Sequence, residues 1–109
     1  MIEVPLTATP NQELAIELEG QDCTIQIRQL GEYLYMTLWL DSTLIRDSAI
    51  CMPMVAIIQG SVANFKGNFV IVDSTSDTLQ QGDPSYEELG ERFKLLYLTD
   101  DEVAEYVIS

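Results

Sequence analysis

Apolar and polar residues alternate along the first third of the chain, and this alternation constrains the fold more than any other feature. The stretch LAIELEG places Leu14, Ile16 and Leu18 on one side of an extended backbone, and CTIQIRQL repeats the same period. A period of two is typical of a strand with one buried face. The turn-forming residues of GQD separate the two stretches. We therefore predict an antiparallel hairpin over residues 13–30.

Three further stretches also predict strands. In YLYMTLWLD two apolar sets interleave, which favours a central strand covered on both faces, and LIRDSAICM completes a second predicted hairpin over residues 33–52. FKGNFVIVD is rich in β-favouring residues after a bend at Gly67, and RFKLLYL alternates again. Residues 54–64 fit either a short helix or a strand. Six to seven short strands predict an all-β, mainly antiparallel fold, a small sandwich or a barrel-like domain.

The last residues, 99–109, form an acidic segment with the pattern of a short C-terminal helix. Thr99 and Glu102 have the spacing of a capping box, and apolar residues from Val103 onward recur at helical steps. So short a helix needs a surface to dock on. A length of 109 residues with a hydrophobic fraction of 47% suits one β-rich domain over residues 1–109.

The charge of the chain excludes several kinds of partner. Eighteen acidic residues against five basic ones give a net charge of -13, which disfavours binding to nucleic acid and to anionic lipid. No apolar run reaches the roughly 20 residues that span a bilayer, and no secretion signal precedes IEVPL. We expect synthesis in a cytoplasm, where Cys23 and Cys51 would be buried free thiols.

The residues needed for common catalytic sites are missing. The chain contains no histidine, so Ser-His-Asp and Cys-His sites and His-based zinc sites cannot form. It contains neither a Walker loop nor a GxGxxG motif, and Asp73, Asp77 and Asp83 lack the spacing of a calcium loop. We predict no enzyme, no cofactor and no metal site. An enzyme using carboxylates such as Glu88 as acid and base is kept as a third hypothesis.

Three aromatic residues are the candidate interface. Tyr33, Tyr35 and Trp39 share one face of the strand YLYMTLWLD. Aromatic side chains anchor interfaces at low entropic cost. If this face is not part of the core, we expect it to contact a partner protein.

The stretch GDPSYEELGERF predicts a rigid structural corner. An Asp-Pro pair sets a turn, Tyr86 can lay its ring on the core, and Gly90 permits a positive φ where the turn meets the last strand. Arg92 is expected to bind an acidic neighbour, Glu88 or Asp83. The candidate corner residues are Asp83, Pro84, Tyr86, Gly90 and Arg92.

The order of these motifs resembles one known family, the small plug proteins of the baseplate of contractile-tailed bacteriophages, of the cyanophage type. The resemblance includes PNQ at residues 10–12, the strand YLYMTLWLD, and the pair Cys51 and Pro53. FKGNFVIVD is similar to the family pattern F-x-G-x-[LF]-V-x-[VI]-D. DPSYEELGERFKLLYL is similar to D-P-x-Y-x-x-L-G-x-R-[FY]-x-L-x-Y-L.

The resemblance implies a virion structural protein that is mostly β and not an enzyme. It implies a place near the axis of the tail tube, held by baseplate hub and tail-tube proteins, and assembly as a homo-oligomer or ring. The charge of -13 would keep the passing DNA from adhering if the acidic side faced the lumen, with the candidate interface toward the hub. The alternative is a small intracellular β-fold binding module for a peptide or protein partner.

Overall fold

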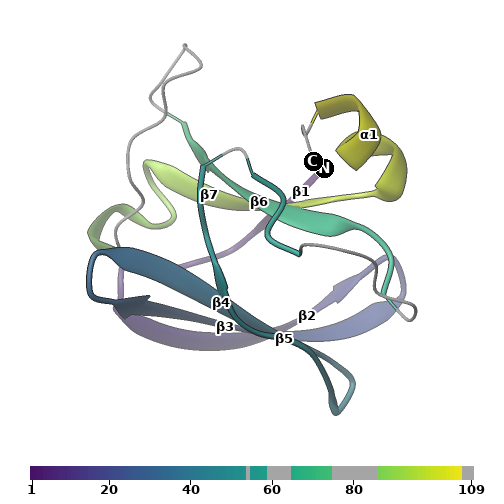
Figure 1. The fold of residues 1–109 in the computed structure, drawn as a ribbon, viewed down its shortest axis with the longest axis horizontal. Helices are drawn as coiled ribbons and strands as arrows, with labels where there is room; N and C mark the ends of the chain where they lie inside the picture. Colours follow the sequence, from purple (N-terminus) through teal and green to yellow (C-terminus); the bar gives the residue numbers. More distant parts are fainter. Residues whose placement is uncertain (54, 59–64, 75–85, 107–109) are drawn as a thin grey trace.

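Two antiparallel β-sheets face each other, and a short helix lies on one of them (Figure 1). The computed structural model describes residues 1–53, 55–58, 65–74 and 86–106. The four-stranded sheet has the order β2-β3-β4-β5, formed by β2 (Asn11–Leu18), β3 (Gln21–Leu30), β4 (Tyr33–Leu40) and β5 (Thr43–Ile50). The three-stranded sheet has the order β1-β7-β6, formed by β1 (Ile2–Val4), β6 (Asn68–Asp73) and β7 (Phe93–Leu98). The predicted all-β fold is confirmed as a sandwich with seven strands among the described residues.

Both predicted hairpins are confirmed in the four-stranded sheet. In the first, Leu14 pairs with Ile25 and Leu18 with Gln21. Its turn is Glu19 and Gly20, both at positive φ (50° and 76°), a conformation that matches the twist of the strands it joins. The second hairpin joins β4 to β5 and contains a bulge in which Ser48 adopts a φ of 53°.

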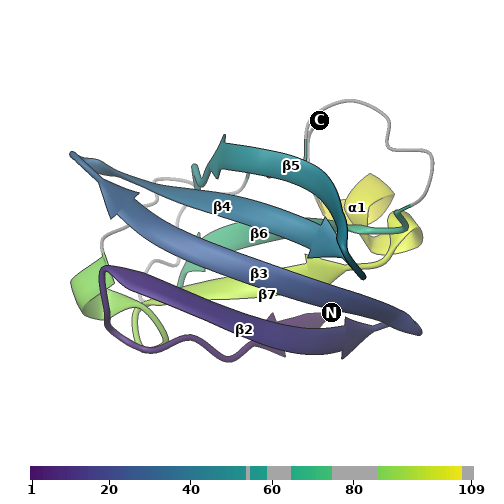
Figure 2. The ribbon, with the colours of Figure 1, turned by 90° about the horizontal axis from the view of Figure 1, so that it is seen from below.

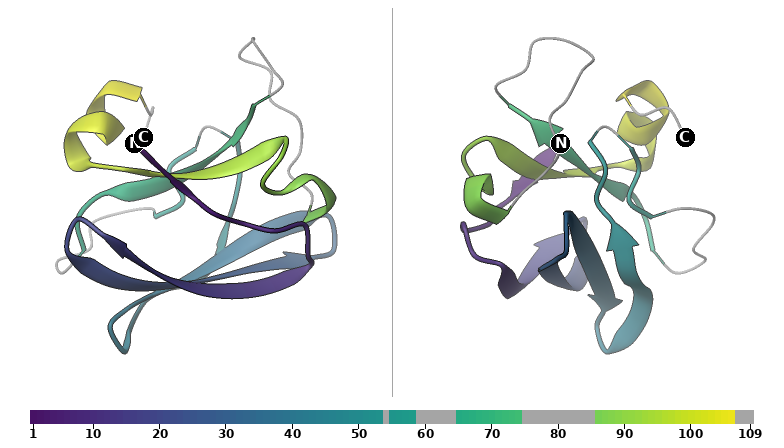
Figure 3. Two further views of the ribbon diagram at one scale, coloured as in Figure 1. Left: turned by 180° about the vertical axis from the view of Figure 1, so that it is seen from behind. Right: turned by 60° about the vertical axis from the view of Figure 1, so that its left-hand side comes forward.

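The three-stranded sheet joins the two ends of the chain. β7 is its central strand, with Ile2 opposite Tyr97 on one side and Phe69 opposite Tyr97 on the other. Figure 3 shows β1 beside β7 from behind. β1 was not among the predicted strands, because three residues are too short to display a period.

Residues 55–58, left open between helix and strand, are neither. The N–H of Ile57 donates to the carbonyl oxygen of Phe69 at 2.9 Å, and Asn68 Oδ1 accepts from the N–H of Ile58 at 2.9 Å. Pro53 forms a parallel bridge to Ile71. This segment therefore lies along the free edge of β6; residue 54 and residues 59–64 are outside the described part of the chain.

The core fills the space between the two sheets. Apolar side chains from the inner faces of both sheets are almost completely buried, among them Leu18, Ile25, Leu34, Met36, Leu38, Phe69, Phe93, Leu95 and Tyr97. The rings of Phe65, Phe69 and Tyr97 contact one another. Gly67 adopts a φ of 83° as β6 begins, and a Cβ there would overlap the ring of Tyr97, so the bend predicted at Gly67 is confirmed.

The short helix α1 (Asp100–Tyr106) covers the outer side of the three-stranded sheet. Its predicted capping box is present, since Thr99 Oγ1 accepts from the N–H of Glu102 at 3.3 Å and Glu102 Oε1 accepts from the N–H of Thr99 at 3.0 Å. Val103 packs against a second apolar cluster that contains Val70 and Leu98. The α-amino group of Met1 also binds Glu102 Oε2 at 2.5 Å. Residues 107–109 are outside the described part.

Candidate protein interface

The outer face of the four-stranded sheet carries the three predicted interface residues. Leu34, Met36 and Leu38 of β4 point into the core and are at most 1% exposed. The intervening Tyr33, Tyr35 and Trp39 therefore point away from it, because successive side chains in a strand alternate. Tyr33 is 40% exposed and the other two are half-buried. Figure 2 shows this sheet in front of the three-stranded one.

The expectation that β4 is covered on both faces is wrong. β4 is an inner strand of its sheet, between β3 and β5, but among the described residues a second sheet packs on one of its faces alone. Both interleaved sets in YLYMTLWLD are apolar, so the sequence pattern could not distinguish a doubly covered strand from a singly covered one with an apolar outer face.

Apolar residues of the neighbouring strands extend this surface. Leu30 lies opposite Tyr33, Ile50 opposite Tyr35, and Leu44 opposite Trp39. These three aliphatic side chains are 49%, 42% and 51% exposed. We name the set the aromatic face, which consists of Leu30, Tyr33, Tyr35, Trp39, Leu44 and Ile50. Leu30 could have been found from the sequence, since it continues the outward-facing set of its strand.

A hydrogen-bonded polar group lies between the two ends of the aromatic face. Thr37, which is 3% exposed, accepts from the N–H of Ser48 at 3.0 Å and donates to Asp47 Oδ1 at 3.3 Å. Arg28 Nη2 donates to Ser48 Oγ at 2.7 Å. These bonds fix the β5 bulge onto the sheet. The aromatic face is therefore held on a rigid support.

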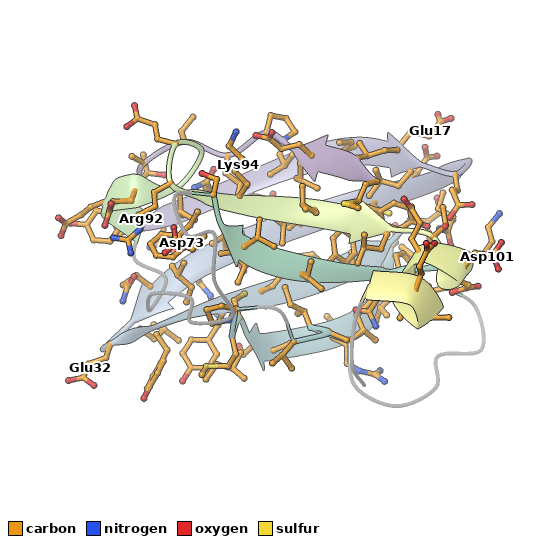
Figure 4. All side chains as sticks on the ribbon, turned by 90° about the horizontal axis from the view of Figure 1, so that it is seen from above. Glu17, Glu32, Asp73, Arg92, Lys94 and Asp101 are labelled. Atoms are coloured by element: carbon orange, nitrogen blue, oxygen red, sulfur yellow. The ribbon has the colours of Figure 1, made fainter. Side chains whose placement is uncertain are left out.

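The predicted corner contains an ion pair that the sequence did not predict. Arg92 Nε and Nη2 donate to the two carboxylate oxygens of Asp73 at 3.1 and 2.9 Å, and Nη1 lies 3.5 Å from Glu88 Oε1 (Figure 4). The Asp73 side chain is 2% exposed, and its hydrogen bond raises the pKa of Arg92 above the ordinary value. Glu88 was one of the two expected partners. The other, Asp83, lies outside the described residues, as does Pro84.

Tyr86 and Gly90 connect the corner to both sheets. Tyr86 belongs to a 3-10 turn, η1 (Tyr86–Glu88); its side chain packs against the core, and its N–H donates to Gln29 Oε1 at 3.2 Å. Gly90 has a φ of 85°, as expected, and a Cβ there would overlap the carbonyl oxygen of Leu6. The corner thus contacts the ends of β3 and the segment after β1. These contacts hold the corner in place against the rest of the fold.

Carboxylates gather at the opposite end of the sandwich. Glu19, Asp22 and Asp41 line an open hollow with a volume of about 570 Å³. Among the described residues, no set of His, Cys, Asp or Glu side chains has the arrangement of a metal site. Cys23 and Cys51 are buried free thiols, and burial raises their pKa to about 11 and about 12.

The fold and this surface define a class of protein: a small all-β domain in which the outer face of one sheet carries four of the seven exposed large apolar side chains of the described residues. Such a face is typical of domains that bind other proteins. A family model described as "Cyanophage baseplate Pam3 plug gp18" matches residues 1–101 of the 109. The chain belongs to this family of phage baseplate plugs, and the resemblance seen in the sequence motifs is confirmed.

The family indicates a structural role in a phage baseplate. No curated protein matches the chain. No helix in the described residues is long and apolar enough to cross a membrane.

Proposed function

We propose that the chain is a non-catalytic plug subunit of a contractile-tail baseplate and that it acts through contacts with hub and tail-tube proteins in the virion. The aromatic face is the observation that carries this proposal. It joins two tyrosines and a tryptophan to exposed aliphatic neighbours on a hydrogen-bonded support. Tyr and Trp are the residue types enriched at the centres of protein interfaces, where they contribute most of the binding energy.

The distribution of charge supports an orientation for this subunit. α1 lies on the side of the sandwich away from the aromatic face (Figure 1), and it carries exposed carboxylates at Asp100, Asp101 and Glu105. An acidic surface repels the phosphates of DNA. The aromatic face would contact the hub, and the α1 side would face the lumen through which DNA passes.

The assembly state is part of the same proposal. Tail components surround an axis, so we propose that several copies occupy a ring, held by their neighbours. With a charge of -13 on each copy, contacts to other proteins are favoured over direct association in dilute solution. The subunit would be made in the host cytoplasm and incorporated into the virion from there.

Capture of the tagged protein from cells that express the full set of particle proteins tests this function. Mass spectrometry of the captured material should identify hub and tube proteins in a fixed ratio to the tagged chain, and native mass spectrometry of the complex should give the copy number. Recovery of a lone monomer, or of host proteins alone, would contradict the proposal and favour the intracellular binding module.

A further inference from the structure

The four-stranded sheet ends in a long and regular edge at β2. β2 is the first strand in the order β2-β3-β4-β5, and Figure 2 shows it at one margin of the sheet with β5 at the other. Its eight residues pair with β3 without a register shift. Among the described residues, no backbone group outside β3 bonds to the backbone of residues 12–18. Residues 12–18 of β2 therefore present an open row of N–H and C=O groups about 24 Å long, at about 3.4 Å per residue.

The other sheet edges are protected. β5 contains the bulge at Ser48, which breaks the regular spacing of its backbone groups. β6 is bordered by residues 53–58, and β1 has three residues. β2 alone combines length and regularity with an uncovered edge in the described part of the chain. A strand from another protein would add to the sheet here.

The two faces of β2 specify what such a strand would carry. Glu13 and Glu17 lie on the outer face and are exposed, with Ala15 between them. Leu14 and Ile16 lie on the inner face and are incompletely buried at this margin of the core. An added strand would place basic residues opposite the two glutamates and apolar residues beside Leu14 and Ile16. Such a strand alternates Lys or Arg with apolar residues.

A second copy of the chain does not fit this edge. Antiparallel pairing of two β2 strands about Ala15 would place Glu13 opposite Glu17 twice, and like charges directly opposite each other are destabilising. Of the five basic residues, Arg92 and Lys94 alone stand at alternate positions, but Arg92 binds Asp73, and Lys94 belongs to β7, which already pairs with β1 and β6. The acidic surroundings of β2, with Asp22 opposite Glu17, also favour a cationic strand.

We propose that an extended segment of a different protein, with Lys or Arg at alternate positions and apolar residues between them, adds to β2 as a fifth antiparallel strand. This contact goes beyond the plug function, because it uses backbone groups at the sheet edge and none of the aromatic face. Glu17 of β2 and Glu32 of the turn between β3 and β4 lie at different corners of the sheet (Figure 4).

The test uses an eight-residue peptide that alternates lysine and valine, together with two control peptides. One control carries N-methyl groups on the backbone nitrogens of alternate residues, which removes the ladder hydrogen bonds on one edge. The other has the same composition in scrambled order. Fluorescence anisotropy gives the dissociation constants with the full chain, and amide hydrogen exchange followed by NMR locates the bound peptide.

We expect the alternating peptide to slow exchange at every second amide of residues 12–18 and to bind at least about tenfold more tightly than either control. The double variant Glu13→Gln/Glu17→Gln should weaken binding about fivefold. The matched variant Glu91→Gln/Glu105→Gln removes the same charge elsewhere and should weaken it less than about twofold. Trp39→Ala should leave it unchanged.

Three outcomes would overturn this assignment. Equal binding of all three peptides would mean that net charge alone attracts them. Protection of β5 amides in place of β2 amides would mean that the peptide binds to the other edge of the sheet. Absence of binding at millimolar peptide would mean that the edge does not accept a strand of this chemistry. Each result is independent of whether hub and tube proteins are captured with the tagged chain.

Discussion

Arg92 holds Asp73 through two parallel hydrogen bonds, one to each carboxylate oxygen, at 3.1 and 2.9 Å. The carboxylate is buried at the end of β6, whereas the guanidinium lies partly in solvent in the turn before β7. A planar guanidinium satisfies both oxygens of a carboxylate at once, which an ammonium group cannot do. The turn is thereby fixed to the strand beside it.

Removal of the Arg92 guanidinium should destabilise the fold, because it leaves the Asp73 carboxylate buried without its main partner. We expect Arg92→Ala to lower Tm by about 5 °C or more, and Arg92→Lys to recover part of the loss. The control is Lys94→Ala, which removes an exposed ammonium 3.8 Å from Glu3. Thermal unfolding followed by circular dichroism measures both; equal shifts would contradict the assigned role of the pair.

A side chain at residue 90 should lower the stability of the fold for two reasons that can be measured separately. Gly90→Ala places an L-residue at a φ of 85° and its Cβ against the carbonyl oxygen of Leu6. We expect the free energy of unfolding in urea to fall by about 2–4 kcal/mol. Gly31→Ala has a φ of 65° but no atom within 4 Å of the added Cβ, so it should cost about 1 kcal/mol. If the two variants lose the same stability, the collision with Leu6 is not the cause.

Truncation of Trp39 should separate binding from folding. Trp39 is half-buried on the outer face, so Trp39→Ala should keep the circular dichroism spectrum and lose about 1 kcal/mol of stability. Its recovery with hub and tube proteins should fall about tenfold or more. Val55→Ala shortens an exposed apolar side chain in the segment that borders β6 of the other sheet, and it should be captured like the parent chain. Normal capture of the Trp39→Ala variant would mean that Trp39 is not part of the interface.

The two cysteine thiols should be inert in the folded chain. Cys23 and Cys51 are each 1% exposed, and burial raises their pKa to about 11 and about 12. At pH 8 only about one thiol in a thousand or fewer would be ionised. We expect iodoacetamide to label neither residue in buffer and both in concentrated urea, as read by mass spectrometry. Rapid labelling of either cysteine in buffer would mean that this part of the core opens readily.

The attachment of α1 should weaken in acid. The hydrogen bond from the Met1 α-amino group lowers the pKa of Glu102 below its ordinary value of 4.5. A lowered pKa means that the contribution to stability is fully present above 4.5 and is lost as the pH falls through the folded value. The protection factors of the α1 amides should fall relative to those of the β7 amides over this pH range. Glu102→Gln should remove this pH dependence and leave the α1 amides as weakly protected at neutral pH as they are in acid in the parent chain. An unchanged pH profile of protection in the variant would contradict the assignment.

The hairpins were predictable because their residues are close in sequence and their alternation is regular. The helix was predictable from Thr99 and Glu102, since a capping box depends on local spacing. The candidate interface residues were placed on one face by the alternation of side chains along a strand alone. Whether that face is open depends on how many sheets pack on β4, which no local pattern of residues encodes.

Long-range contacts account for what was missed. β1 is a strand because β7 pairs with it, although the two are more than ninety positions apart along the chain. Asp73 is the last residue of a strand, a position where an aspartate is usually on the surface. Its burial against Arg92 becomes apparent only in three dimensions. The open edge at β2 likewise depends on the order of the strands, in which no described strand lies beyond β2.

The pairing of β1 with β7 also determines when the domain can be completed during synthesis. The four-stranded sheet is made of consecutive hairpins, so it can form while later residues are still inside the ribosome. β7, which both β1 and β6 require, emerges after the whole four-stranded sheet and β6. Until then the inner face with Ile25, Met36 and Leu38 has no opposing sheet. The growing chain is therefore most prone to aggregate just before its last strand leaves the exit tunnel.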